Sequence, residues 1–387
     1  MTRAPIDSLS GNKERNAMKL KPFRLERYFA RYEFTAPYLL CCSDCESLSV
    51  GDLLQMEAGA REDLLALRLG YTESVGSPEL RTAIASLYDH ISADEVLVHT
   101  GAEEAIFNFM NSVLEPGDHL VVHSPYYQSL GEVALGIGAD VTEWRSASRQ
   151  SWELDLASLS DALTNKTRAV VINVPHNPTG YLPDRDFMTE LSKLSDERGF
   201  LVFSDEVYRG LEYEPSIRLP SFADLNARGA SLGVMSKAYG LAGLRIGWIA
   251  TRNSPLFRKM AAFKDYTTIC NSAPSEFLAT LALKHGDAIV ERNLSIIRSN
   301  IALLNAFFDK YRDRFEWSAP KAGPIAFPRY LGKSVTDFCH QLVADAGVLL
   351  LPGTFYGDDY DCFRIGFGRA NMADALERLD TFLEESG

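Results

Sequence analysis

The sequence predicts an α/β protein whose larger domain holds a mostly parallel, seven-stranded sheet flanked by helices. A smaller α/β domain built from the two chain ends is expected beside it. Short apolar runs alternate with helical patterns between residues 95 and 250, which is typical of a parallel sheet covered on both faces. The chain has 387 residues, enough for two domains, and its 46% of apolar residues is ordinary for a folded globular protein.

Seven runs are short and apolar enough to be strands of one sheet. They are Glu95–His99, His119–His123, Asp140–Trp144, Ala169–Val174, Leu201–Ser204, Ser231–Met235 and Ile246–Ala250. Helical patterns separate most of them, at Ala102–Leu114, Leu130–Leu135, Leu156–Leu163 and Asp184–Arg198. Because parallel neighbours need such crossover connections, the runs predict a large, cofactor-binding domain over residues 66–275.

The segments on either side predict the smaller domain, over residues 18–65 and 276–387. A short helix is expected at Val50–Ala58 in the first of these segments, whereas the helix expected at Pro78–His90, with Pro78 in a first-turn position, opens the larger domain. A long helical region over residues 275–315 follows the sheet. The tail predicts strands near Ile325–Tyr330, Val348–Leu351 and Phe363–Phe367, and helices near Val335–Ala346 and Ala373–Glu385.

Charge and chain ends exclude several function classes. A net charge of −13 argues against nucleic acid and anionic membranes as partners, because both attract basic surfaces. No apolar run reaches the roughly 18 residues of a membrane span. The first 17 residues are polar and lack the apolar stretch of a secretion signal. They predict a disordered leader and a cytoplasmic protein, with Met18 as an alternative start.

Two N-terminal features are interpreted as structural. Cys41, Cys42 and Cys45 raise the hypothesis of a metal site, but zinc needs four ligands and no second Cys or His pair accompanies them. Free thiols in a reducing compartment fit better, so no metal is predicted. The aromatic-rich segment over residues 22–40 is expected to pack on a surface, such as that of a partner subunit, rather than to carry chemistry.

Polar residues follow five of the predicted strands, at the edge where open α/β sheets bind their ligands. These residues are Gly101, Ala102 and Glu103, then Tyr127, Asn177, Asp205 with Tyr208, and Ser236 with Lys237. A lysine at a buried strand end has a lowered ammonium pKa, which lets its amine attack a carbonyl. The alternative is a strand-capping lysine that points to water, and the local sequence does not decide between them.

The start of the helix after the first strand has two interpretations. Thr100 and Glu103 match a capping box, which would only stabilise the helix. The free N–H groups of Ala102 and Glu103 would instead hold a phosphate at the positive end of the helix dipole. In that case the Glu103 carboxylate must point away from the phosphate.

The other strand-end residues suit a planar, phosphorylated ring. The ring-directed candidates are Asp205 for a protonated ring nitrogen, Tyr208 and Asn177 for a phenolic oxygen, Tyr127 for stacking and Arg245 for the phosphate. Each also has a structural alternative, namely a helix cap, a turn, core packing or a surface ion pair. Taken together they predict a pocket for pyridoxal 5′-phosphate, with Lys237 as the Schiff-base lysine.

These motifs resemble those of the class I/II aminotransferases, which are pyridoxal-phosphate enzymes of fold type I in the aspartate aminotransferase superfamily. The resemblance extends from Tyr71 to Arg369, and Ser236-Lys237 with its following glycines and Arg245 is similar to the family's attachment signature. It implies that Lys237 carries the cofactor and moves a proton to and from the substrate α-carbon. The predicted activity is amino-group transfer between an amino acid and a 2-oxo acid.

The resemblance also implies roles for two residues outside the strand ends. Arg364 would grip the substrate α-carboxylate bidentately. Tyr71 would reach the phosphate in the neighbouring subunit, which implies a homodimer. For the strand-end residues it implies the cofactor contacts already described, with Ala102 and Glu103 acting through their backbone and Asn177 also near the substrate.

Three departures from the family pattern bear on specificity. Val234 replaces a residue that is often serine or glycine, so a phosphate hydroxyl is missing there unless Ser236 replaces it. Residues 41–46 occupy the place of the glycine-bearing segment that usually covers the substrate. The region of the second arginine of dicarboxylate-specific members contains Asp265, which together with Asp44 suggests a neutral or cationic amino acid.

Other functions on this scaffold stay open or are disfavoured. Lyases and cyclases of the capreomycidine synthase kind would use the same cofactor pocket, so the motifs do not separate elimination and ring closure from transamination. A non-catalytic regulator needs a DNA-binding module, and a leader of 17 residues is too short for one. A nicotinamide dehydrogenase is disfavoured because no G-x-G-x-x-G motif opens the first helix.

Overall fold

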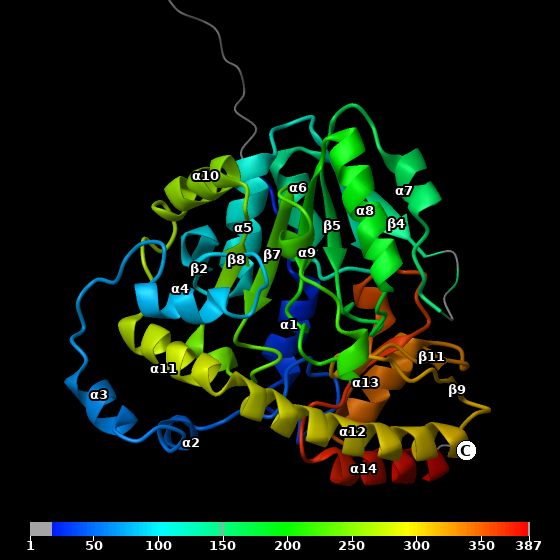
Figure 1. Cartoon of the computed structure of the whole chain (residues 1–387). Helices are drawn as coiled ribbons and strands as arrows, with labels where there is room; N and C mark the ends of the chain where they lie inside the picture. Colours follow the sequence, from blue (N-terminus) through cyan, green and yellow to red (C-terminus); the bar gives the residue numbers. More distant parts are fainter. Residues whose placement is uncertain (1–17, 147, 149–150, 386–387) are drawn as a thin grey trace, which may run out of the picture.

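A seven-stranded sheet forms the centre of the computed structural model, which describes residues 18–146, 148 and 151–385 (Figure 1). The leader predicted over residues 1–17 lies outside the described residues. The strands are β2 (Val96–His99), β3 (His119–Ser124), β4 (Asp140–Arg145), β5 (Thr167–Asn173), β6 (Leu201–Asp205), β7 (Gly229–Val234) and β8 (Gly247–Ala250). Their order is β2-β8-β7-β6-β5-β3-β4. Only β8 runs antiparallel to its neighbours, so the prediction of a mostly parallel sheet is confirmed.

Both faces of the sheet are buried, because successive side chains of a strand point to opposite sides. In β3, Leu120 and Val122 belong to one core, whereas Val121 belongs to the other. The first core is covered by α4 (Pro78–Ala85), α5 (Ala102–Val113), α6 (Ser129–Ile137), α10 (Ser254–Lys264) and α11 (Ala273–Lys284). The second core is covered by α7 (Leu156–Ala162) and α8 (Arg185–Arg198), and α9 (Phe222–Leu225) packs on β7.

The two ends of the chain meet in a second group of elements below the sheet (Figure 1). Its strands are β1 (Tyr38–Leu39), β9 (Phe315–Glu316), β10 (Ile325–Ala326), β11 (Arg329–Tyr330), β12 (Val348–Leu349), β13 (Leu351–Pro352) and β14 (Phe363–Gly366). Its helices are α12 (Gly286–Lys310), α13 (Val335–Asp345) and α14 (Met372–Glu385). The N-terminal β1 pairs in parallel with β12, while β10, β14 and β13 form an antiparallel sheet.

Three predicted elements are shorter than expected or are divided into two. The helix expected over Pro78–His90 stops at Ala85, and further on the Asp224 carboxylate accepts the N–H groups of Asp89 and His90. The strand expected over 325–330 splits into β10 and β11 around Pro328, which has no N–H to donate to a ladder. The helix begun by the Ser49 capping box, α2 (Val50–Leu54), is shorter than expected.

Two further helices complete the described chain: α1 (Arg24–Tyr32) and α3 (Ala60–Ala66). The helix α1 lies beside the carboxyl ends of the central strands and holds Leu25 and Tyr28 in a small core with Cys41. Within the described residues, no helix is both long enough and apolar enough to cross a membrane.

Candidate active site

A cavity of about 510 Å³ opens at the carboxyl ends of the central strands. Ten of the twelve predicted site residues line it: Ala102, Glu103, Tyr127, Asn177, Asp205, Tyr208, Ser236, Lys237, Arg245 and Arg364. The other two do not. Gly101 lies directly behind Arg245, and Tyr71 is 93% exposed on the loop before α4, outside the pocket of its own chain.

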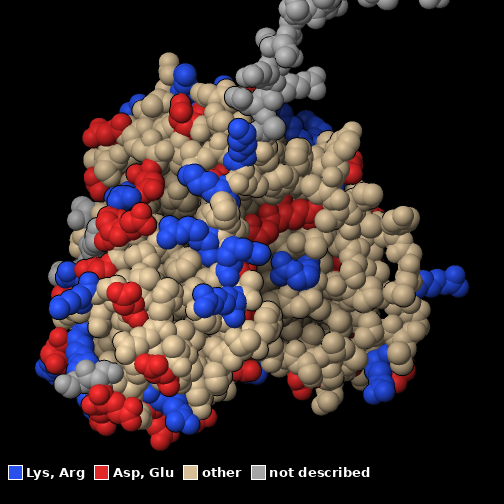
Figure 2. Space-filling model, turned by 180° about the vertical axis from the view of Figure 1, so that it is seen from behind, with Lys and Arg blue, Asp and Glu red and all other residues tan. Residues whose placement is uncertain are grey.

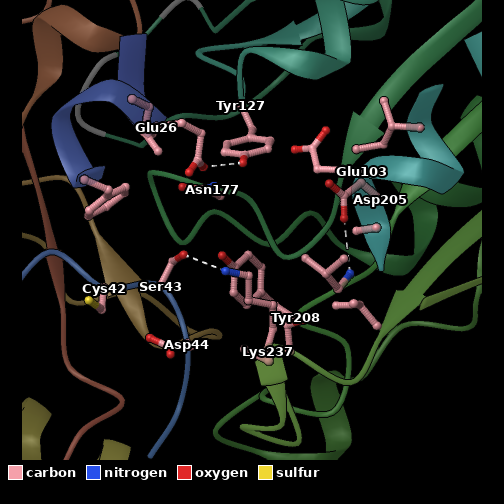
Figure 3. Close-up of a pocket in the computed structure, with 18 of the residues that line it drawn as sticks. Glu26, Cys42, Ser43, Asp44, Glu103, Tyr127, Asn177, Asp205, Tyr208 and Lys237 are labelled. Atoms are coloured by element: carbon pink, nitrogen blue, oxygen red, sulfur yellow. Dashed lines mark hydrogen bonds between the residues drawn. The ribbon is translucent and has the colours of Figure 1, made fainter. Parts of the chain in front are cut away.

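Lys237 enters the pocket from the turn that follows β7. Its amine donates a hydrogen bond of 2.9 Å to the Ser43 hydroxyl (Figure 3). Burial lowers the pKa of Lys237, while the nearby Asp44 carboxylate acts in the opposite direction. Loss of hydration disfavours the ammonium form, so the site favours an uncharged amine that can act as a nucleophile.

Asp205, at the end of β6, carries a buried carboxyl group that forms no ion pair within the described residues. It is 6% exposed, and Oδ1 accepts the Val207 N–H at 3.2 Å. Burial raises the pKa of Asp205 to about 7, against the smaller opposing effects of this hydrogen bond and of Lys237. A protonated ring nitrogen would supply the missing positive charge and restore the ionised form.

Tyr208, three residues further on, presents a buried hydroxyl with no group placed to complete a well-formed hydrogen bond. The Ser43 hydroxyl nonetheless lies close enough to favour its ionised form, although burial dominates and raises the pKa of Tyr208. A buried, unpartnered hydroxyl is costly in a folded protein. An oxygen atom of a bound ring would remove that cost.

Asn177 and Arg364 meet at the opposite wall of the pocket. The Asn177 Oδ1 accepts hydrogen bonds from Arg364 Nη1 at 3.3 Å and from the Tyr356 hydroxyl at 3.1 Å. Arg364 also donates to the Tyr356 oxygen at 2.9 Å and, through Nε, to the Cys41 carbonyl at 3.0 Å. The guanidinium is 1% exposed and forms no ion pair within the described residues. It can therefore accept a carboxylate ligand.

The first turn of α5 and Arg245 form a possible phosphate cradle. Gly101 has φ of 82°, caps α5 without a side chain, and leaves the first N–H groups of the helix free. A Cβ on Gly101 would lie 2.5 Å from Arg245 Nη2, so only glycine lets the backbone and the guanidinium approach so closely. The predicted capping box is wrong, because Gly101 is the N-cap and Glu104, not Glu103, accepts the Thr100 N–H.

Glu103, whose side chain is expected to point away from a bound phosphate, is one of the residues that face the cavity. Its carboxylate lines the cavity, where it accepts a hydrogen bond from the Ser129 hydroxyl at 3.2 Å. Burial raises the pKa of Glu103, and a hydrogen bond with Tyr127 opposes that shift. The Tyr127 hydroxyl donates to Glu26 at 2.9 Å, which ties the predicted stacking residue to α1 (Figure 3).

Sequence reasoning missed the contribution of α1. The aromatic-rich segment was expected to pack on a surface, but Phe23, Leu25, Glu26, Phe29 and Glu33 line the pocket. A usable signal was present, since Glu26, Phe29 and Glu33 follow the i, i+3, i+7 spacing of one helix face. Tyr356 was also missed, because no local pattern distinguishes it from other loop tyrosines.

The segment expected to cover the substrate does reach the pocket, through Cys42, Ser43 and Asp44. Asp44 is not free, since it forms a two-oxygen ion pair with Arg369 Nη2 at 3.0 and 3.1 Å. Asp265 is exposed and does not line the pocket of its own chain. In the described chain no disulfide joins any of the six cysteines, and no group of three or more potential ligands could hold a metal ion.

Pyridoxal 5′-phosphate fits the groups present. Within the described residues, Asp205 is a buried acid with no ion-pair partner and Tyr208 a buried hydroxyl with no hydrogen-bond partner, while the free N–H groups at the start of α5 and Arg245 suit an anion. Val234, 4% exposed, supplies only apolar lining beside Ser236. Acidic and basic side chains also gather side by side at a hollow on the face shown in Figure 2.

Comparison with known proteins agrees with this arrangement. Residues 44–379 match the model of the family "Aminotransferase class I and II". Capreomycidine synthase from Streptomyces vinaceus is 32% identical over 91% of this chain and 89% of its own length. A PLP-dependent aminotransferase from Streptococcus suis superposes with a TM-score of 0.89 at 30% identity, over 95% of this chain and 99% of its own. The PLP-dependent cyclase OrfR gives 0.87 at 28%, over 95% and 98%.

The matched region contains every pocket residue of the central sheet and Arg364. Because the family model covers far more than half of the chain, the earlier resemblance and the cofactor it implied are confirmed. The chain belongs to the class I and II aminotransferases, a family of pyridoxal-phosphate-dependent enzymes of fold type I.

Proposed function

We propose that this protein is an aminotransferase that moves an amino group between an amino acid and a 2-oxo acid. The observation that carries the proposal is the position of the Lys237 amine in one pocket with Asp205, Tyr208 and Arg364. Pyridoxal 5′-phosphate, when bound, supplies the electron sink that makes the substrate α-proton removable. The residues of the chain bind, orient and move protons around it.

Lys237 is proposed to hold the cofactor and to act as the general base at the substrate α-carbon. Burial lowers the pKa of Lys237, which increases the uncharged fraction of the amine that a base requires. Ser43 Oγ, at 2.9 Å, orients that amine when it is free. Asp205 is proposed to keep the ring nitrogen protonated, and Tyr208 and Asn177 to hydrogen-bond the ring oxygen.

The remaining contacts are proposed to bind two anionic groups, the cofactor phosphate and the substrate α-carboxylate. The N–H groups of Ala102 and Glu103, with Arg245 and Ser236, are proposed to hold the phosphate. Tyr127 is proposed to stack on the ring. Arg364 is proposed to bind the substrate α-carboxylate, because Tyr356 and Asn177 fix its guanidinium while leaving Nη2 without a protein partner among the described residues.

A lyase or cyclase activity on the same site is the second candidate. It is supported by the 32% identity to capreomycidine synthase and by the similarity to the cyclase OrfR. Elimination and transamination begin with the same proton removal, so the groups around Lys237 serve both. The two differ in whether the amino group leaves the substrate.

Spectra and product analysis test both proposals. The reconstituted protein should show an absorbance band near the visible edge that borohydride removes and that a Lys237→Ala variant lacks. An aminotransferase should release one equivalent of 2-oxo acid per site and then stop until a 2-oxo acid is added. A lyase or cyclase should keep turning over without an acceptor, and a wild-type protein without the band would refute both.

Assembly, location and domain division are further parts of the proposal. A homodimer is supported by Tyr71 and Leu69, which are 93% and 81% exposed, with Tyr71 reaching the neighbouring site. The absence of disulfides among the six cysteines, all of which the structure describes, supports a cytoplasmic location. The family match supports a role in amino acid biosynthesis or metabolism. The division into residues 66–275 and a domain of 18–65 with 276–387 is supported by the pairing of β1 with β12.

A further inference from the structure

The pocket holds more acid than the proposed cofactor chemistry uses. Three cations line it, and each has a proposed role with the cofactor or the substrate carboxylate. Five carboxylates line it as well: Glu26, Glu33, Asp44, Glu103 and Asp205. Asp205 has a role at the ring, Asp44 is paired with Arg369, and Glu103 and Glu26 accept hydrogen bonds from hydroxyl groups. This leaves one carboxylate unexplained.

That carboxylate is Glu33, the residue directly after the last turn of α1. It is half-buried, and its side chain makes no hydrogen bond or ion pair within the part of the chain that the structure describes, although its backbone N–H donates to the Phe29 carbonyl. Its charged neighbours are Asp44, Arg369, Glu26 and Lys237, so three carboxylates including Glu33 share this end of the pocket. Burial, followed by Asp44, raises the pKa of Glu33, while Arg369 and Lys237 act in the opposite direction, and a further cation beside it would add to their effect.

The α1 face also places Glu33 relative to the proposed substrate carboxylate. Phe29, one turn before Glu33, has its ring centroid 5.7 Å from the Arg364 guanidinium carbon. Glu33 lies four residues further on, about 6 Å along the helix axis. An amino acid whose carboxylate is bound by Arg364 would therefore extend its side chain along α1, past Phe29 and toward Glu33.

We propose that Glu33 binds the distal cation of a basic amino-acid substrate, an ammonium or a guanidinium group. The inference rests on the proposed function, because it assigns the side chain of an amino acid whose carboxylate is held by Arg364. The residue proposed to determine substrate specificity is thus Glu33 at the end of α1, rather than Asp44 and Asp265, which the sequence suggested. The aliphatic stem of such a substrate would pack against Phe29, and the paired Asp44 would add negative charge beside Glu33.

Pairs of ligands that differ in the charge of their distal group test whether Glu33 contacts that group or only supports binding in general. The holoenzyme is titrated with arginine and with citrulline, its neutral isostere, by following the cofactor absorbance. The same pair of titrations is made with a Glu33→Gln variant. Glu62→Gln, on the exposed surface of α3, is the control that removes one negative charge outside the pocket. Calorimetry with 4-guanidinobutanoate and hexanoate adds a readout that needs no reaction, because neither ligand has an α-amine.

The wild type and Glu62→Gln should bind arginine at least 10-fold more tightly than citrulline, and 4-guanidinobutanoate more tightly than hexanoate. Glu33→Gln should remove most of this preference and leave citrulline and hexanoate binding unchanged. The inference is overturned if the wild type shows no preference for the charged ligands, or if Glu33→Gln weakens charged and neutral ligands equally. If no amino acid changes the cofactor spectrum, the proposed function itself fails and this inference fails with it.

Discussion

Replacing Asp205 by asparagine should stabilise the apoprotein and weaken the holoenzyme. The carboxyl group is 6% exposed, forms no ion pair with any residue that the structure describes, and accepts one N–H from Val207. Asparagine keeps an oxygen for that hydrogen bond and removes the buried charge. The same charge is proposed to hold the protonated ring nitrogen. Burying it lowers the stability of the apoprotein, and the bound cofactor offsets that loss.

The size of this effect follows from the pKa of Asp205. Burial raises it from the ordinary 3.8 to about 7, roughly three pH units at about 1.4 kcal/mol each. Between pH 4 and 7 the folded state holds a proton that the unfolded state has lost, so the free energy of unfolding falls as pH rises. Above pH 7 the full cost is about 4 kcal/mol at most. Because the interior relaxes around a charge, we expect 1–3 kcal/mol.

Urea unfolding of the two apoproteins tests the reasoning. The advantage of Asp205→Asn over wild type should be larger at pH 8.5 than at pH 5 by at least about 1 kcal/mol. With pyridoxal phosphate present the order should reverse, with at least 10-fold weaker cofactor binding by the variant. An advantage that is equal at both pH values, or an apo variant that is less stable than wild type at pH 8.5, would refute this account of Asp205.

Three further predictions address the rest of the pocket. Gly101→Ala should weaken cofactor binding at least 10-fold in a spectroscopic titration, because the new Cβ would lie 2.5 Å from Arg245 Nη2. Gly117 serves as the control, because it also has a positive φ, of 86°, but a Cβ there would have no neighbour within 4 Å. Gly117→Ala should therefore cost about 1–2 kcal/mol of stability and leave cofactor binding unchanged. Tyr356→Phe should raise KM for the amino acid about 3- to 10-fold with a smaller change in kcat, since Arg364, proposed to bind the substrate, loses a hydrogen-bond partner at 2.9 Å. A 3- to 10-fold fall in kcat with no change in KM would contradict this role. Capture of the cofactor by the apoprotein should reach its half-maximal rate well below pH 10.5, because burial lowers the pKa of Lys237, and a rate that keeps rising to pH 10.5 would argue against a buried amine.

The success of the sequence at the strand ends has a local cause. Asp205, Lys237 and Asn177 each lie within three residues of the end of a short apolar run, and parallel strands bring their carboxyl ends to one edge whatever the details of packing. The order of residues along the chain is therefore enough to predict that these groups meet. The glycine at position 101 is also readable, because a positive φ is a local property of the backbone.

The wrong predictions concern competition between local partners. Thr100 and Glu103 match the spacing of a capping box, yet the helix starts one residue later and Glu104 accepts the Thr100 N–H instead. Spacing alone cannot choose between two adjacent registers of the same motif. It also cannot tell which way Glu103 points, since the answer depends on Ser129 from the next helix.

The sequence by itself determined the mostly parallel sheet, the family and the residues grouped around Lys237, because strand periodicity and strand-end chemistry are encoded over a few neighbouring residues. Only the tertiary structure decided which groups from distant segments complete the pocket. The Asp44–Arg369 pair joins residues 325 positions apart, and Tyr356 meets Asn177 across 179 positions. No short-range pattern encodes such contacts. The pairing of β1 with β12 and the packing of α1 create them, and through them Glu33 comes to face the substrate side of the site.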